Sequence, residues 1–214
     1  FIKSDGTLWG WGYSSFGQLG NTNMTNPIPF QLSTDTDWHK TFAGVANAFF
    51  IKTNGTLWGM GNSEFGLLGN GSTTQVNPTL QQIGTATNWQ KISASSDMTI
   101  GIKTDGTIWG WGQNDQYEMG NNTCCANQLT PIQIGTANHW VDIETSLGAS
   151  IFALKNDGTL WGWGLNLAGL LADNTVMARS IPTQLNADTD WASIHVGAAH
   201  ILALKTNGTL WAWG

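Results

Sequence analysis

The stretch Asp157-Gly158-Thr159-Leu160-Trp161-Gly162-Trp163-Gly164 decides the fold, because it occurs five times in a chain of 214 residues. The copies begin at Asp5, Asn54, Asp105, Asp157 and Asn207. They differ only by conservative replacements, such as Met60 for a Trp and Ala212 for a Gly. The turn glycines of successive copies stand 49, 51, 52 and 50 residues apart. A near-constant period of about fifty residues predicts an array of supersecondary units.

The stretch itself predicts a hairpin turn followed by a strand. Asp-Gly or Asn-Gly between apolar runs favours a type I′ turn, in which both residues adopt positive φ. Side chains then alternate between two faces, with Thr7, Trp9 and Trp11 on one and Leu8, Gly10 and Gly12 on the other. We expect the sheets to stack, with the indoles of one sheet filling the space over the glycines of its neighbour. The residues expected to build this repeat are Gly6, Trp9, Trp11, Gly55, Trp58, Gly106, Trp109, Trp111, Gly158, Trp161, Trp163, Gly208, Trp211 and Trp213.

Four short strands are predicted in each unit. In the second unit they run from Trp38 to Gly44, over 48–52, from Thr56 to Met60, and over a short segment that ends at Ile83. Four strands per fifty residues predict an all-β chain with the architecture of a β-propeller, since the coils of a β-solenoid are shorter. One partial propeller domain, 1–214, would contain full blades 38–83, 89–134 and 140–185 and partial blades 1–32 and 191–214.

Proline and glycine positions indicate what surrounds each strand. A proline precedes the end of each fourth strand, at Pro29, Pro78, Pro131 and Pro182, which is typical of the outermost strand of a sheet. The second strand is nearly all apolar, as at 201–204, and is therefore expected to be fully buried. Loops of varying length follow the third strand at 21–28, 70–77, 121–130 and 173–181, where binding specificity usually resides.

Composition excludes several classes of partner. Charged residues make up 10% of the chain, against roughly 25% in an average soluble domain. The formal net charge is -6 and Arg179 is the single arginine, which argues against nucleic acid as a partner because phosphates need basic patches. The apolar runs of this segment are all too short for a membrane span.

The repeat resembles the regulator of chromosome condensation family. The matching residues are His200-Ile201-Leu202-Ala203-Leu204-Lys205-Thr206-Asn207-Gly208, then Trp211-Ala212-Trp213-Gly214, and the connection Phe16-Gly17-Gln18-Leu19-Gly20. The resemblance extends over the whole chain and implies a propeller of seven blades. The sequence of the repeat, as in Lys-Thr-Asn-Gly-Thr-Leu-Trp-Ala-Trp-Gly over 205–214, is similar to that of bacterial, often secreted members. This similarity implies a secreted or cell-surface protein, with a cytoplasmic location as the alternative.

Blade counting predicts an arc of a larger ring. Both ends of the chain carry a third strand, so the two partial blades cannot merge into one, and seven such units need about 350 residues. We therefore expect the chain to be a fragment, opening at Phe1 inside a repeat. Its end sheets are expected to expose apolar faces and strand edges.

Candidate chemical groups are few. Adjacent Cys124 and Cys125 are expected to be two loop thiols, since neighbouring cysteines rarely bond each other. His200 is expected to be a buried structural group with a hydrogen-bond partner. The carboxylate pairs, Asp35 with Asp37 and Asp188 with Asp190, are turn residues or, alternatively, a site for a hard cation. We predict neither catalytic residues, nor a metal, nor a cofactor.

The tryptophans offer one further alternative. Nine of the 13 lie in the third-strand signature, and the other four open the units at Trp38, Trp89, Trp140 and Trp191. Only these four are candidates for surface platforms that stack on sugars. We therefore predict a non-catalytic scaffold that binds a protein partner or a cell-surface ligand through its loops. Guanine-nucleotide exchange on a small GTPase, which rests on fold analogy alone, and carbohydrate binding are the alternatives.

Overall fold

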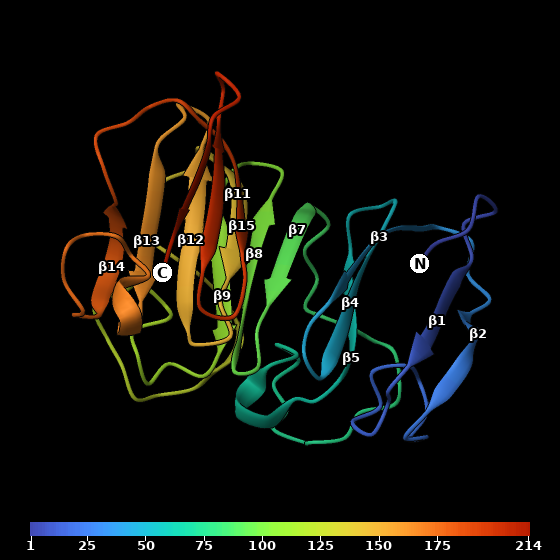
Figure 1. Cartoon of the computed structure of the whole chain (residues 1–214). Helices are drawn as coiled ribbons and strands as arrows, with labels where there is room; N and C mark the ends of the chain where they lie inside the picture. Colours follow the sequence, from blue (N-terminus) through green and yellow to red (C-terminus); the bar gives the residue numbers. More distant parts are fainter.

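Five antiparallel sheets follow one another along the chain in the computed structural model, which describes all 214 residues except the side chain of Ala168 (Figure 1). We call them blades 1 to 5. Blade 1 holds β1 (Leu8–Gly12) and β2 (Asn26–Ser33). Blade 2 holds β3 (Trp38–Ala43), β4 (Asn47–Lys52), β5 (Leu57–Gly61) and β6 (Gln81–Gln82). Blade 3 holds β7 (Trp89–Ala94), β8 (Met98–Lys103), β9 (Ile108–Gly112) and β10 (Gln128–Gln133).

Blade 4 holds β11 (Trp140–Thr145), β12 (Ser150–Lys155), β13 (Leu160–Gly164) and β14 (Arg179–Gln184). Blade 5 holds β15 (Trp191–Val196), β16 (Ile201–Lys205) and β17 (Leu210–Trp213). Two single-turn 3₁₀ helices, η1 (Glu64–Gly66) and η2 (Leu167–Gly169), lie in loops. The predicted all-β class is confirmed.

Strands pair in chain order within each blade, so the fourth strand is an edge strand, as predicted. Pro29, Pro131 and Pro182 lie in β2, β10 and β14, where a missing N–H costs nothing. The second strands of blades 2 to 4 are the buried ones, and all six residues of β8 are buried. Their apolar composition follows from this position, because both faces of the sheet are covered by neighbouring blades. The expectation of full burial is wrong for 201–204, because Leu202 and Leu204 of β16 are 39% and 38% exposed on a face that no described blade of this chain covers.

The hairpin between the second and third strands differs from the type I′ turn that Asp-Gly predicts. The N–H of Gly6 donates to the carbonyl of Lys3 at 2.9 Å, and the N–H of Lys3 donates to the carbonyl of Thr7 at 3.0 Å. Only the glycine has positive φ, at +81°. This is a three-residue loop closed by a left-handed glycine, which also matches the right-handed twist of the flanking strands.

The Asp or Asn before that glycine orders the turn through its side chain. Asp157 Oδ1 accepts hydrogen bonds from the backbone N–H and the hydroxyl of Thr159, at 3.0 and 2.6 Å. The Thr159 hydroxyl oxygen accepts one from Nε1 of Trp161 at 2.8 Å, and Lys155 Nζ lies 3.6 Å from the centroid of that indole. The relay recurs in all five repeats, so the first Trp of each signature is held by its own hairpin.

The second Trp of the signature reaches the preceding blade. Nε1 of Trp163 donates to the carbonyl of Glu118 at 2.8 Å. Trp111 and Trp213 make the same bond to the carbonyls of Leu67 and Leu170, at 2.9 and 2.8 Å. Each acceptor belongs to the glycine-rich connection that follows the third strand. These bonds tie consecutive blades together.

The expectation that these indoles cover the strand glycines of the neighbouring blade is wrong. Gly110 in β9 is covered by Ile134 and Met119 of its own blade. The Trp163 indole instead packs over Gly120 of the connection, where an added Cβ would lie 3.0 Å from Nε1. A buried indole N–H is stabilised by an acceptor, which the strand-opening Trp38, Trp89 and Trp140 lack among the described residues. The strand carbonyls of the neighbour are committed to their own sheet, whereas a carbonyl of the connection is available.

The apolar cores lie between blades. Between blades 2 and 3, Phe49, Ile51 and Leu57 pack against Trp89 and Trp111. Equivalent residues form the cores between blades 3 and 4 and between blades 4 and 5. Each sheet is therefore stabilised mainly by apolar contacts with the blades on either side of it.

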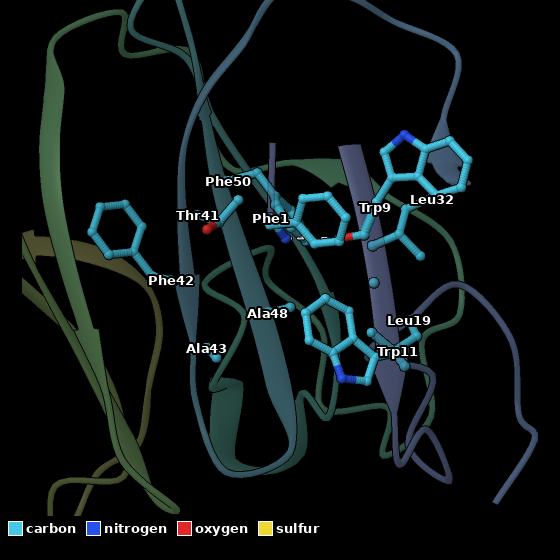
Figure 2. A pocket seen from close by; sticks show the side chains of 11 residues that line it. Phe1, Trp9, Trp11, Leu19, Leu32, Thr41, Phe42, Ala43, Ala48 and Phe50 are labelled. Carbon is cyan, nitrogen blue, oxygen red and sulfur yellow. Dashed lines mark hydrogen bonds between the residues drawn. The ribbon is translucent and has the colours of Figure 1, made fainter. Parts of the chain in front are cut away.

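Apolar faces are exposed at both ends of the arc, as predicted. Trp11 is 54% exposed, and Figure 2 shows it with Phe1 beside a cavity of about 180 Å³ between blades 1 and 2. At the other end the exposed residues are Leu202, Leu204, Leu210 and Trp211. Trp11 has no preceding blade in this chain to accept its N–H, which explains the contrast with fully buried Trp163.

We expect Trp163→Phe to lower the free energy of unfolding by about 1–3 kcal/mol, because the Glu118 carbonyl is left without its donor in a buried site. Trp161→Phe is the matched control, because its N–H bonds within its own, partly exposed hairpin. Guanidinium unfolding followed by circular dichroism measures both. Equal losses for the two variants would contradict the role given to the bond between blades.

Candidate functional site

One end of the blades gathers the loops of variable length. Antiparallel strands return to the same end, so the loops after each third strand lie beside the turns between the first and second strands. We call this end the loop face; η1 and its neighbouring loops mark it in the lower part of Figure 1. It consists of residues 13–25, 44–46, 62–80, 95–97, 113–127, 146–149, 165–178 and 197–200.

The side chain of a buried serine or asparagine holds the base of each long loop through hydrogen bonds to the loop backbone. Asn166 is fully buried; its Oδ1 accepts the N–H of Leu171 at 2.8 Å, and its Nδ2 donates to the Thr175 carbonyl at 3.0 Å. Corresponding residues, two positions after the last glycine of the third strand, are Ser14, Ser63 and Asn114. Sequence reasoning missed these anchors, although they stand 49, 51 and 52 residues apart like the turn glycines.

Large apolar side chains are exposed on these long loops and on the short turns beside them. They are Tyr13, Met24, Val45, Val76, Leu147, Leu167, Val176 and Met177, with exposures from 38% to 68%. Within the part of the chain that the structure describes, the hairpins and linkers at the opposite end expose no large apolar residue of this kind. An open hollow of about 510 Å³ lies on the loop face between Gly169 and Val176.

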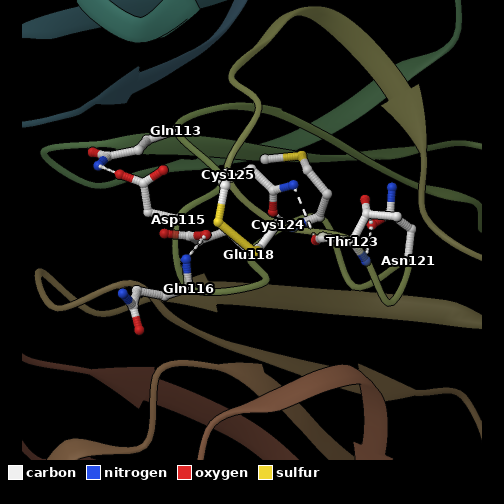
Figure 3. Close-up of a disulfide and its surroundings, with 10 residues drawn as sticks. Gln113, Asp115, Gln116, Glu118, Asn121, Thr123, Cys124 and Cys125 are labelled. Atoms are coloured by element: carbon white, nitrogen blue, oxygen red, sulfur yellow. Dashed lines mark hydrogen bonds between the residues drawn. A yellow bond between two sulfur atoms is a disulfide. The ribbon is translucent and has the colours of Figure 1, made fainter.

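A disulfide lies in the loop of blade 3. Figure 3 shows Cys124 bonded to Cys125, so the expectation of two free thiols is wrong. The loop bends sharply here, because Cys125 has a φ of +70° and its N–H donates to the Asn114 carbonyl at 2.7 Å. This bend was not visible in the sequence, since neither cysteine is a residue that favours positive φ.

The same loop buries a carboxyl group. Glu118 is 1% exposed, and its Oε2 accepts the N–H of Gln116 at 2.8 Å. Burial raises the pKa of Glu118 above its ordinary value, and the nearby carboxylates add to the effect. Blade 1 has Gln18 at the corresponding position, where the amide oxygen accepts the N–H of Phe16 at 3.0 Å. The Glu118 carboxylate thus accepts the same backbone hydrogen bond that the uncharged Gln18 amide accepts in blade 1.

The carboxylate pairs hold a cation of the chain itself. Lys205 Nζ lies 2.8 Å from Asp188 Oδ2 and 2.9 Å from Asp190 Oδ1. Lys52 is held in the same way by Asp35 and Asp37, at 2.7 and 3.0 Å. A lysine ammonium thus occupies the place that a hard cation would take, as the pairing of Asp188 and Asp190 with Lys205 illustrates. Across the described residues, no group of three His, Cys, Asp or Glu has the arrangement of a metal site.

The corresponding lysine of blade 3 has no carboxylate pair, because Ala86 and Asn88 stand at those positions. Lys103 Nζ lies 3.4 Å from the centroid of the Trp109 indole. Burial lowers the pKa of Lys103 below its usual range, with a smaller opposing influence of Asp105. The indole face is thus the constant partner of this lysine position, and the carboxylates are additions of two blades.

Two further expectations are corrected. The strand-opening Trp38, Trp89, Trp140 and Trp191 are only 3–5% exposed and pack between blades, so they cannot serve as sugar platforms. His200 is exposed rather than buried. The corresponding Ser150 of blade 4 is the buried group, and its hydroxyl donates to the Leu165 carbonyl at 2.6 Å.

Comparison with known proteins identifies the repeat. A family model of the regulator of chromosome condensation (RCC1) repeat matches residues 5–51, 54–102, 105–151 and 157–204, and a related RCC1 repeat model matches 89–118. The ultraviolet-B receptor UVR8 of Arabidopsis thaliana is 23% identical over 202 residues, which make up 87% of this chain and 43% of the receptor.

Two solved structures are similar over 100% of the chain. Human WBSCR16 gives a TM-score of 0.84 at 17% identity, with 58% of its own chain covered. Prp20p from Saccharomyces cerevisiae, described together with its binding properties to Gsp1p and histones, gives 0.79 at 17% identity, with 55% covered. The chain spans less than half of UVR8 and little more than half of these two structures. At such identities the likeness shows the propeller fold. No described helix has the length and apolar character to cross a membrane.

We expect Glu118→Gln to stabilise the protein at neutral pH. A raised pKa means that the folded state binds this proton more tightly than the unfolded chain. The stabilising contribution is therefore present below the unfolded pKa, near 4.3, and is lost as pH rises through the folded pKa. Thermal unfolding of Glu118→Gln and of the parent protein from pH 4 to 8 should show a gain that grows with pH. A destabilised Glu118→Gln at pH 7 would refute this account.

Proposed function

The chain belongs to the regulator of chromosome condensation (RCC1) repeat family, as its resemblance predicted, and from this premise we propose that it is a non-catalytic scaffold whose loop face binds a protein partner. The observation that supports the proposal is the set of exposed apolar side chains on the loop face. Several large apolar side chains exposed at the same end of a folded protein favour a site of interaction there.

Chemistry at the loop face favours a protein over other ligands. Val176 and Met177 stand next to each other at 65% and 68% exposure, and methionine adapts well to a partner surface. Buried Asn166 fixes the backbone beneath them. Less conformational freedom is then lost on binding than with a loose loop. A net charge of -6 further disfavours a polyanionic partner.

The two alternatives have less support. Guanine-nucleotide exchange rests on a fold shared with Prp20p, and fold alone does not carry an activity. Carbohydrate binding would need exposed tryptophans on which sugars stack, and the strand-opening tryptophans that were candidates for this role are buried.

The proposal is tested with a photo-crosslinking amino acid at the position of Met177 and, as matched control, at exposed Thr206 in a hairpin of the opposite end. We expect a protein adduct in cells from position 177 and none from 206. With the purified partner, Met177→Asp should weaken binding about tenfold, because a charge is forced into an apolar contact, while Thr206→Asp should leave it unchanged.

Adducts from position 206 alone would place the interface at the wrong end. Accelerated release of labelled guanine nucleotide from Gsp1p by this chain would replace the scaffold with an exchange factor.

We also infer a location outside the cytoplasm, at the cell surface or in the extracellular medium. The Cys124–Cys125 disulfide supports it, because disulfides persist in oxidising compartments. Fractionation of the source cells, with mass spectrometry of the peptide containing both cysteines, should find the protein outside the cytoplasm with the cysteines oxidised. Reduced protein in the cytosolic fraction would overturn the inference.

A further inference from the structure

The disulfide on the loop face joins two neighbouring residues that solvent can reach. The bond between Cys124 and Cys125 closes a small ring that contains the peptide bond between them (Figure 3). Cys124 is half-buried and Cys125 is exposed. Exposed disulfides are the ones that thiols reduce readily. We propose that this bond is a site of thiol–disulfide exchange, at which a dithiol reductant opens the ring and frees the loop over 121–127. The site does not depend on which partner the loop face binds.

The ring holds Cys125 in a backbone conformation that cysteine disfavours. Its φ of +70° lies in the left-handed region, which residues other than glycine and asparagine rarely adopt. In this conformation the N–H of Cys125 donates to the Asn114 carbonyl at 2.7 Å. Once the two sulfurs are separate, no ring restrains Cys125, and we expect its φ to become negative. Its N–H then turns away from the Asn114 carbonyl, and the hydrogen bond is lost.

That hydrogen bond attaches the loop to the buried residue that holds its base. Asn114 is 3% exposed, and its Nδ2 donates to the Thr123 carbonyl at 3.1 Å. Its Oδ1 accepts the N–H of Met119 at 3.0 Å. The backbone and the side chain of Asn114 thus bind the loop on both sides of Cys124. Opening the ring removes the Cys125 bond, so the segment after residue 120 should gain freedom while Met119 keeps its place.

The loop also contacts the following blade just before the disulfide. The N–H of Asn122 donates to the Ser180 carbonyl at 2.9 Å, and the Ser180 hydroxyl donates to Asn122 Oδ1 at 2.7 Å. Ser180 lies in β14, which begins directly after the loop that exposes Val176 and Met177. Reduction is therefore expected to loosen the contact between the loop of blade 3 and blade 4. The redox state of one bond would alter the surface where these two blades meet.

The exchange consumes one dithiol and transfers two electrons. A thiolate of the reductant attacks the sulfur of Cys125, the more exposed of the two residues, and forms a mixed disulfide. The Cys124 sulfur leaves as a thiolate. The second thiolate of the reductant then attacks the reductant sulfur of the mixed disulfide, and the Cys125 sulfur leaves in turn. The two protein thiolates take up the two protons that the reductant gave to water, and the reductant ends as a cyclic disulfide.

Amide hydrogen exchange of the whole 214-residue chain, measured by NMR, tests the proposal. The chain is oxidised with oxidised glutathione and compared with the same chain in dithiothreitol. We expect the amides of Asn122 and Cys125 to exchange about tenfold faster after reduction, because each loses a hydrogen bond. The amide of Thr175, which donates to Asp173 in the loop of blade 4, should be unchanged. Far-ultraviolet circular dichroism should also be unchanged.

Two double variants separate the bond from the backbone conformation that it enforces. Cys124→Ser with Cys125→Ser cannot form the bond, so its Asn122 amide should exchange as fast as in the reduced protein, with or without dithiothreitol. Cys124→Ser with Cys125→Gly lacks the bond as well, but glycine adopts positive φ readily. Its Asn122 amide should therefore exchange more slowly than in the first variant.

Three results would overturn the proposal. The chain equilibrated with oxidised glutathione still contains two free thiols by alkylation and mass spectrometry. The oxidised and reduced chains exchange equally at Asn122 and Cys125. In the third, reduction abolishes the circular dichroism of the sheets, because the bond then stabilises the whole fold and is no local exchange site. The first two measurements use the unaltered sequence, so misfolding of a variant cannot explain them.

Discussion

The hydrogen bond from the second Trp of a signature to the preceding blade is the interaction on which this architecture depends. In blades 3 to 5 this Trp lies between two sheets whose carbonyls are already committed to strand pairing, so its N–H requires an acceptor elsewhere. Trp111, Trp163 and Trp213 meet the requirement with a carbonyl of the connection that follows the third strand of the preceding blade. Each bond therefore fixes the distance between two blades and at the same time holds the base of a loop.

Because the acceptor is a backbone carbonyl, the side chain at that position is free to vary. Leu67, Glu118 and Leu170 all accept the indole, although one is an acid and two are aliphatic. Above them, a buried serine or asparagine closes each loop, and Asn166 does so with both atoms of its amide. Loop length and surface composition can change without disturbing either bond, which is how a strict repeat carries loops that differ.

The repeat itself was readable from the sequence because glycine spacing and alternating indoles are local signals. The turn type was not, since Asp-Gly is compatible with two loop lengths, and the bonds of Gly6 and Lys3 select the three-residue one. The acceptor for the second Trp of a signature lies some 45 positions away in the sequence, as with Trp163 and Glu118. The disulfide and the buried Glu118 likewise depend on the conformation of one loop. That loop differs from the loops of the other repeats, so the repeat pattern could not predict it.

The two ends of the blades differ in how many of their charged and apolar groups find partners within the chain. At the hairpin end, Lys205 is bound by Asp188 and Asp190 and lies over Trp191, so its charge and the aromatic face are both used within the chain. At the loop face the backbone is held from below, while side chains such as Met24 and Met177 remain exposed. Rigid loops with unsatisfied apolar surface favour association, whereas internally paired charges add little to it. The asymmetry therefore supports the proposal that a partner binds at the loop face, whereas the hairpins satisfy their polar groups within the chain.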